Sequence, residues 1–239
     1  MPWTLEQAVA EVARLIDERQ PTFFITANLH YAMLTERDPL VRTINQQAAF
    51  LLADGMPFVW ASRAGKVRLP ERVPGSDLIF ALSKQAAARG HRIFFLGGQP
   101  GVAAQAAANL QARYPGLVVA GIEAPPFRPL SVEENAAMVK RIREARPDLL
   151  FVAFGQPKGE RWIAENLHHL GVPVSVQLGA SIDFAAGRVR RAPQWIQRVG
   201  MEWAFRLYLE PRRLAGRYAK NATFLLRRSA QDWRRAERN

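Results

Sequence analysis

Two residues that could act on a hydroxyl and on a phosphate lie in the first third of the sequence. Asp54 ends the apolar run AFLLA and precedes Gly55, a position from which a carboxylate could serve as a general base. The neighbouring apolar residues would raise the pKa of this carboxylate and favour abstraction of a proton from a hydroxyl. The alternative is that Asp54 caps a helix beginning at Met56.

Arg72 lies in the segment LPERVPGSD, where Pro and Gly bracket a loop just before an expected helix. A guanidinium and a helix N-terminus together suit a phosphate, and the alternative is an exposed loop arginine. The segment GQPKGERW offers Gln156 and Lys158 on another turn that leads into a helix. Either could contact a ligand, or Lys158 could be a solvated residue of the first helical turn.

A glycine turn, IFFLGGQPG, contains Gly97 and Gly98. It resembles turns that place a phosphate at a helix N-terminus, and Glu123 ends the next apolar run, where an acid that binds ribose could lie. The alternative is a turn that chain geometry alone requires. Because the spacing is not GxGxxG, the turn supports a nucleotide site but not an NAD site.

Metal and thiol chemistry find little support in the sequence. It has no cysteine, no HExxH and no DxD segment, and His168 and His169 are adjacent, so they point to different faces of a helix. We therefore predict neither a metal nor a cofactor, and we expect arginines to neutralise any phosphate.

Short apolar runs alternate with amphipathic patterns over the first 190 residues. Strands are predicted at 22–28, 50–55, 91–98, 116–123, 147–155 and 172–181, and helices at 38–48, 76–90, 101–114, 131–145 and 160–170. Ser76 and Ser131 are expected N-caps, and Gly90 and Gly171 are expected to end helices. Strands that are apolar on both faces predict a Rossmann-like α/β fold, with a parallel sheet sandwiched by helices. Ligands bind beyond the carboxyl ends of such strands.

Positive charge is concentrated at the end of the sequence. Of the net charge of +12, residues 188–239 carry +10, from 14 Lys and Arg against 4 Asp and Glu. After Arg190 the pattern becomes one long helical stretch with a break at Pro211. We predict a core at 1–190 and a basic amphipathic helical appendage at 191–239, which calls for a local anionic partner unless it is only a solvated helix face.

Seven segments, taken in order, resemble the WecG/TagA/CpsF glycosyltransferases, known also as glycosyltransferase family 26. They are TAN (26–28), LADGMPFVWAS (52–62), ERVPGSDL (71–78), FFLGG (94–98), GQPKGERWI (155–163), GASIDFAAGRVRRAP (179–193) and EWAFRLYLEPRR (202–213). The resemblance implies inverting, metal-independent transfer of a sugar from a UDP-sugar to a sugar on a membrane-bound polyprenyl diphosphate. Its products would be cell-surface polysaccharide or teichoic acid.

The resemblance also implies residue roles. Asp54 becomes the expected catalytic base, and Arg72 a contact of the phosphate or leaving group. The appendage would dock on an anionic membrane, close over the active site and lend arginines to the diphosphate. The remaining candidates are the pocket positions Thr26, Asn28 and Gln156, and the appendage residues Arg206, Arg213 and Arg217.

This chain departs from the family pattern at two places. Where the family often reads T-P-N-x-E, it has TANLHY, with Ala27, His30 and Tyr31, and the common P-K-Q-E appears as PKGE, with Gly159. Residues that meet the substituents of a sugar are those most expected to differ. UDP-glucose, UDP-N-acetylmannosamine and the uronic acid of the latter therefore stay open as donors.

Two other functions compete. A pI near 11.0 and the interleaving of arginine with aromatic residues also suit a nucleic-acid-binding protein, and the glycine turn suits a nucleotide-dependent oxidoreductase. Neither a signal peptide nor a membrane-spanning segment is visible in the sequence. We expect a cytoplasmic glycosyltransferase held at the inner face of the plasma membrane, without a nucleic-acid partner, and a homo-oligomer stays open.

Overall fold

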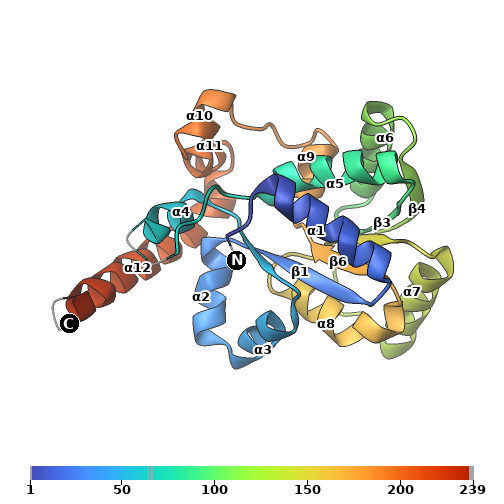
Figure 1. Cartoon of the computed structure of the whole chain (residues 1–239), viewed down its shortest axis with the longest axis horizontal. Coiled ribbons are helices and arrows are strands. Elements are labelled where there is room, and N and C mark those ends of the chain that lie inside the picture. Colours follow the sequence, from blue (N-terminus) through green and yellow to red (C-terminus); the bar gives the residue numbers. More distant parts are fainter. Residues whose placement is uncertain (1, 64, 66, 237–239) are drawn as a thin grey trace.

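The computed structural model describes residues 2–63, 65 and 67–236, without the side chains of residues 198, 213, 217, 226 and 228–236. Among these residues, six strands form a parallel sheet in the order β2-β1-β6-β5-β3-β4 (Figure 1). The strands are β1 Thr22–Ala27, β2 Leu51–Ala53, β3 Arg92–Gly97, β4 Val118–Glu123, β5 Leu149–Ala153 and β6 Val174–Gln177. Each apolar run predicted as a strand forms one, so the predicted α/β fold is confirmed.

Helices cover both faces of the sheet. Successive side chains of a strand point to opposite faces, so the apolar strands pack against a helical layer on each side. Phe24 and Phe151 pack toward one layer, and Phe23 and Leu150 toward the other. Figure 1 shows the two layers on opposite sides of the strands. The first layer holds α1 Leu5–Glu18, α5 Gly75–Arg89, α6 Val102–Arg113 and α9 Ser181–Ala185, and the second holds α2 Leu29–Arg37, α3 Pro39–Gln47, α7 Val132–Ala145 and α8 Lys158–Leu170.

Local sequence signals mark several of the helix ends. Ser131 forms a capping box with Glu134 at the start of α7. Gly90 and Gly171 adopt the left-handed conformation at the ends of α5 and α8. These three predictions are confirmed, and each of these helix ends is marked by residues next to it in the sequence.

The prediction that Ser76 caps α5 is wrong. The N-cap is Pro74, with an extended backbone, and Ser76 is buried in the first turn of the helix. A Cβ atom on Gly75 would lie 2.7 Å from Ser181 Oγ, so α5 begins where the missing side chain of Gly75 lets it approach α9 closely.

The end of the chain forms α10 Gln194–Arg198, α11 Glu202–Leu209 and α12 Pro211–Ala236. The predicted break at Pro211 is confirmed, because Glu210 leaves the helical conformation and Pro211 begins α12. The stretch is not one helix, however, since Gly200 has a φ of +75° between α10 and α11. α12 contacts α2 and extends away from the sheet (Figure 1). The division between a core and an appendage at residue 190 stays a prediction.

Candidate active site

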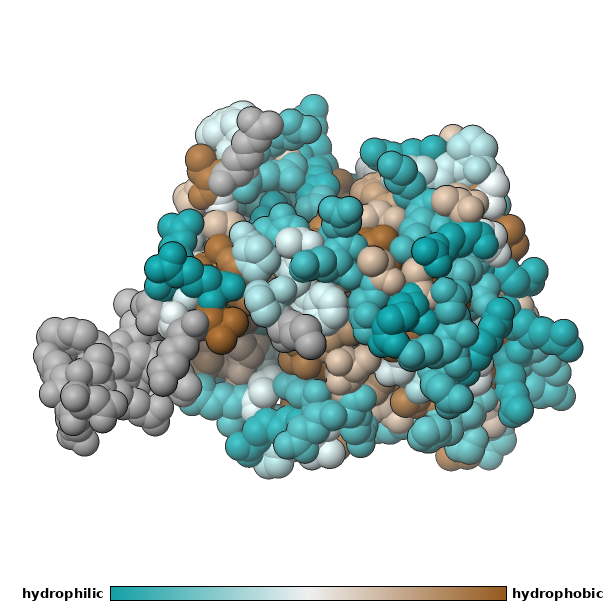
Figure 2. Space-filling model, in the orientation of Figure 1, coloured by the Kyte–Doolittle hydropathy of each residue, from teal (hydrophilic) through white to brown (hydrophobic). Residues whose placement is uncertain are grey.

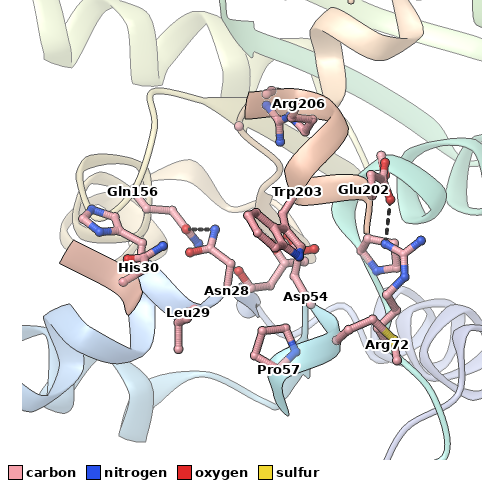
Figure 3. Close-up of a pocket in the computed structure, with 18 of the residues that line it drawn as sticks. Asn28, Leu29, His30, Asp54, Pro57, Arg72, Gln156, Glu202, Trp203 and Arg206 are labelled. Carbon is pink, nitrogen blue, oxygen red and sulfur yellow. Dashed lines mark hydrogen bonds and ion pairs between the residues drawn. The ribbon is translucent and has the colours of Figure 1, made fainter. Parts of the chain in front are cut away.

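A cavity of about 620 Å³ lies beyond the carboxyl ends of β1, β2, β5 and β6 (Figure 3). Its opposite wall comes from α4 (Met56–Ser62), α11 and α12. Residues from both ends of the sequence thus meet around one space. Parallel strands bring their carboxyl ends to the same edge of a sheet, which is where ligands bind in folds of this class.

The cavity collects most of the residues that the sequence singled out. Gly97, Gly98 and Lys158 do not line it, and the side chains of Arg213 and Arg217 lie outside the described residues. The predicted residues that do line it are Thr26, Asn28, Asp54, Arg72, Gln156 and Arg206.

Asp54 follows β2 and lines the cavity, where Figure 3 shows it in the same space as Asn28 and Trp203. Its backbone N–H donates to the carbonyl of Ala27 at 2.8 Å, so the residue is tied to the end of the neighbouring strand. The N-cap position of α4 belongs to Gly55, whose φ of +147° suits glycine. Asp54 is therefore not the capping residue that the alternative interpretation proposed.

A chain of amides crosses the floor of the cavity. Asn28 Nδ2 donates to Gln156 Oε1 at 2.6 Å, and Gln156 Nε2 donates to the carbonyl oxygen of Thr26 at 2.8 Å and to Glu160 Oε1 at 2.9 Å. Asn28 also caps α2, because its Oδ1 accepts from the backbone N–H of Tyr31 at 3.1 Å. Both amides are thus held in defined orientations.

Glu160 lies just outside the cavity and is buried, with only 1% of its surface exposed. Burial raises the pKa of this carboxyl from 4.5 to about 7, although hydrogen bonds from its own backbone N–H and from Gln156 oppose the rise. The low dielectric around the group penalises its charged form. Sequence reasoning missed Glu160, since an acid in the first turn of a helix is usually solvated.

Arg72 is already paired with an acid of the appendage. Its Nη1 lies 2.8 Å from Glu202 Oε2, and the two side chains are 16% and 13% exposed (Figure 3). Glu202 also lies 3.8 Å from Arg191, which forms an ion pair with Asp77 of α5. An anionic ligand that reaches Arg72 would therefore compete with Glu202. The sequence analysis gave Glu202 no role, although the residue begins the family-like segment 202–213, because its partner lies 130 positions earlier.

Arg206 on α11 points into the cavity, where its guanidinium carbon lies 5.4 Å from the centre of the Phe184 ring. This distance is typical of a cation–π contact. Its Nε is buried and has no hydrogen-bond partner among the described residues. Of the three candidate arginines of the appendage, Arg206 is the one whose side chain the structure describes, and it lines the cavity.

Apolar side chains form the outer part of the cavity. Trp203 lines the cavity and packs against Tyr218, with ring centres 5.9 Å apart. Pro57 and Trp60 of α4 and Leu225 of α12 complete this wall. The site thus joins a polar floor to an apolar mouth.

The glycine turn after β3 has a packing role in the structure. A Cβ atom on Gly97 would lie 3.0 Å from the carbonyl oxygen of Ala153 and 3.0 Å from Phe154 Cδ1. Glu123, considered as a ribose-binding acid, pairs with Arg141 at 2.5 Å. Lys158 lies at the start of α8. These residues are not brought together with Asp54 and Arg72.

The departures from the family pattern occupy different places. His30 lines the cavity, whereas Ala27, Tyr31 and Gly159 do not. Tyr31 is buried and donates from its hydroxyl to Asn45 Oδ1 at 2.8 Å, and burial raises its pKa. A Cβ atom on Gly159 would overlap Oε1 of the cavity residue Gln177, so glycine at 159 leaves room for this side chain.

Within the described residues, no group of three or more His, Asp or Glu side chains is placed to hold a metal ion. Nor does any helix in that part of the chain have the length and apolar character needed to cross a membrane.

Known proteins resemble this chain over most of its length. The profile of the Glycosyl transferase WecG/TagA/CpsF family matches residues 2–238. A protein of Bacillus subtilis (strain 168) is 32% identical over 196 residues, which cover 82% of this chain and 75% of the relative. A protein of Staphylococcus aureus (strain NCTC 8325 / PS 47) is 33% identical over 195 residues, which cover 80% and 74%. Both relatives are named N-acetylglucosaminyldiphosphoundecaprenol N-acetyl-beta-D-mannosaminyltransferase.

Proposed function

Because this chain belongs to the WecG/TagA/CpsF family of glycosyl transferases, we propose that it transfers N-acetylmannosamine from its UDP derivative to N-acetylglucosamine on a polyprenyl diphosphate. The predictions of the family and of a glycosyltransferase are confirmed. The names of the relatives specify this sugar and this kind of acceptor. They therefore support N-acetylmannosamine over the two other donor sugars considered.

The observation that carries the proposal is that the carboxylate of Asp54, the amides of Asn28 and Gln156 and the guanidinium groups of Arg72 and Arg206 all line one cavity (Figure 3). Asp54 can take a proton, Arg72 and Arg206 can neutralise a diphosphate, and amides can bind the hydroxyl and acetamido groups of a sugar. The cavity volume of about 620 Å³ falls in the range of small-molecule sites.

In the proposed reaction Asp54 is the general base. The acceptor hydroxyl attacks the anomeric carbon of the donor, its proton passes to Asp54, and the bond between the anomeric carbon and the UDP oxygen breaks. The bonding electrons leave with UDP, whose added negative charge Arg72 and Arg206 stabilise. A single displacement of this kind inverts the anomeric configuration. Because the two guanidinium groups carry positive charge, they can stabilise the charge on departing UDP without a metal ion.

The appendage supplies a surface for a lipid-linked acceptor. Of the fifteen large apolar side chains that are exposed in the described residues, seven lie between Trp195 and Leu225. Figure 2 shows apolar side chains at the surface near α4 and α10, toward the left of the view. Arg212, Lys220 and Arg227 are exposed on α12, and each basic residue near an anionic surface contributes about 1 kcal/mol. We propose that α10 to α12 dock on an anionic membrane.

The test measures UDP release with UDP-N-acetylmannosamine, with UDP-glucose as the competing donor, and with a polyprenyl-diphosphate-linked N-acetylglucosamine acceptor. Asp54→Asn should lower turnover by about 10²–10⁴-fold and leave the thermal shift caused by UDP intact. Arg72→Ala should lower both. Lys140→Ala, at an exposed position on α7, is the control. Near-normal turnover of Asp54→Asn would show that another group takes the proton.

No observation from the described residues supports either of the two competing functions. The oxidoreductase hypothesis depended on the turn at Gly97 and Gly98, which does not line the cavity. The nucleic-acid hypothesis depended on the basic appendage, of which Arg206 and Trp203 face the cavity. A thermal shift by UDP without one by NAD or DNA separates all three functions.

A further inference from the structure

Glu160 is a buried acid that the proposed reaction does not use. It is the third residue of α8 and is 1% exposed, and its Oε2 has no hydrogen-bond partner among the described residues. A buried carboxyl of this kind is costly, and an apolar residue of similar size would be cheaper to bury. Proteins tolerate such a cost most often beside a functional site.

The hydrogen bonds of Gln156 show what Glu160 does to its neighbour. One hydrogen of Gln156 Nε2 goes to the carbonyl of Thr26 and the other to Glu160 Oε1. Because both hydrogens are used in these directions, the oxygen of the amide must face the other way. That oxygen accepts from Asn28 Nδ2 at 2.6 Å.

The same constraint passes to Asn28. Its Oδ1 is held by the backbone N–H of Tyr31, so its nitrogen is the atom that can face Gln156. If the Gln156 amide were reversed, two NH₂ groups would face each other and the bond between the side chains would be lost. The orientation of both cavity amides therefore depends on an acceptor at position 160.

We propose that Glu160 is a positioning residue that sets which atoms of Gln156 and Asn28 face the cavity, and so which sugar substituents the cavity can bind. An acid suits this role because Oε1 can accept from Gln156 both in the carboxylate form and when a proton is on Oε2, which has no partner among the described residues. An amide at the same place could turn and donate instead. The proposal rests on the proposed function, because it takes Asn28 and Gln156 as contacts of a sugar. Glu160 acts on the reaction only through them.

The competing explanation is that Glu160 only stabilises the start of α8, where a negative charge is favourable. The two explanations predict different results when the acceptor is removed. If Glu160 only stabilises the helix, replacing it should lower the melting temperature, and activity should fall only to the extent that the protein unfolds. If Glu160 positions the amides, replacing it should lower activity without lowering the melting temperature, because removing a buried charge also removes the cost of its desolvation.

The experiment compares Glu160→Met, which keeps the volume but removes the acceptor, with Glu160→Gln, which retains one. Glu165→Met, at an exposed position of the same helix, is the control. We expect Glu160→Met to lower kcat/KM by about tenfold or more without lowering Tm, and Glu160→Gln to recover it to within about threefold of the wild type. Wild-type kcat/KM in Glu160→Met, or a loss that follows a fall in Tm, overturns the proposal.

A second readout does not need turnover. In ¹⁵N spectra of the wild type, both Nε2 protons of Gln156 should exchange slowly with solvent, and in Glu160→Met one of them should lose this protection. Unchanged Gln156 signals in Glu160→Met overturn the positioning role. If the wild-type enzyme transfers none of the UDP-sugars, the proposed function fails, and the spectra still decide whether Glu160 orients the amide.

Discussion

Replacing Glu160 by glutamine should stabilise the protein above pH 7 and leave its stability almost unchanged near pH 4.5. Burial raises the pKa of this carboxyl from 4.5 to about 7 in the folded chain. Between these two values the folded chain holds a proton that the unfolded chain has released. The stability attached to this proton is fully present below pH 4.5 and is lost as the pH rises through about 7.

The size of the effect follows from the difference between the two pKa values. About 2.5 units correspond to about 3 kcal/mol, at roughly 1.36 kcal/mol for each unit. Glutamine carries no charge at any of these pH values. The free energy of unfolding of Glu160→Gln should therefore exceed that of the wild type by about 3 kcal/mol at pH 8, which raises Tm by about 6–12 °C for a chain of this length.

The assay is thermal and urea unfolding of the wild type and Glu160→Gln in the same buffers from about pH 4.5 to 8.5, the range that spans both pKa values. Taking the difference between the two proteins removes the contribution of all other titrating groups. Glu165→Gln, at an exposed position of α8, should differ from the wild type by the same small amount at every pH. A pH-independent difference for Glu160→Gln, or a less stable variant above pH 7, would refute the reasoning, because the hydrogen bonds would then outweigh burial.

Three further substitutions test other contacts. Glu202→Gln should tighten the binding of UDP by about three- to tenfold in calorimetry, because it removes the acid that competes for Arg72; unchanged or weaker binding would contradict the competition. Gly159→Ala should lower the free energy of unfolding by about 1–3 kcal/mol, since its Cβ would overlap Gln177, and adding Gln177→Ala should recover part of this loss; additive losses would contradict the overlap. Ser131→Ala should cost about 1 kcal/mol in urea unfolding through loss of the capping box, and no loss would show that the cap is replaced by water.

The fold could be predicted from the sequence because its signals are local. Apolar runs mark the strands, and Ser131, Gly90 and Gly171 mark helix ends through contacts within a few residues. The strand order could not be predicted, because nothing near β6 in the sequence indicates that it pairs with β1 on one side and β5 on the other. The prediction for Ser76 fails because α5 begins one residue earlier, at Gly75, which packs closely against Ser181, a residue far away in the sequence.

The same distinction between local and long-range signals applies to the residues of the candidate site. Asp54 and Gln156 could be predicted because they follow strands, and all carboxyl ends of a parallel sheet meet at one edge. Glu160 and Glu202 could not, because their importance comes from Gln156 and Arg72, which they contact in the folded chain. The turn at Gly97 allowed two interpretations, because close packing and ligand binding can both require glycine, and the structure shows the close packing.

α11 has no fully buried residue, and the ion pair between Glu202 and Arg72 is one of the contacts that hold it in the cavity wall. If UDP displaces Glu202 from Arg72, it also breaks one of the contacts that keep α11 in place. Linkage is reciprocal, so breaking the contact between Arg72 and Glu202 must favour the nucleotide by the same factor by which the nucleotide favours breaking it. Binding of the donor and movement of α11 would then be coupled. A membrane that contacts α11 would change the affinity for the donor through the same coupling.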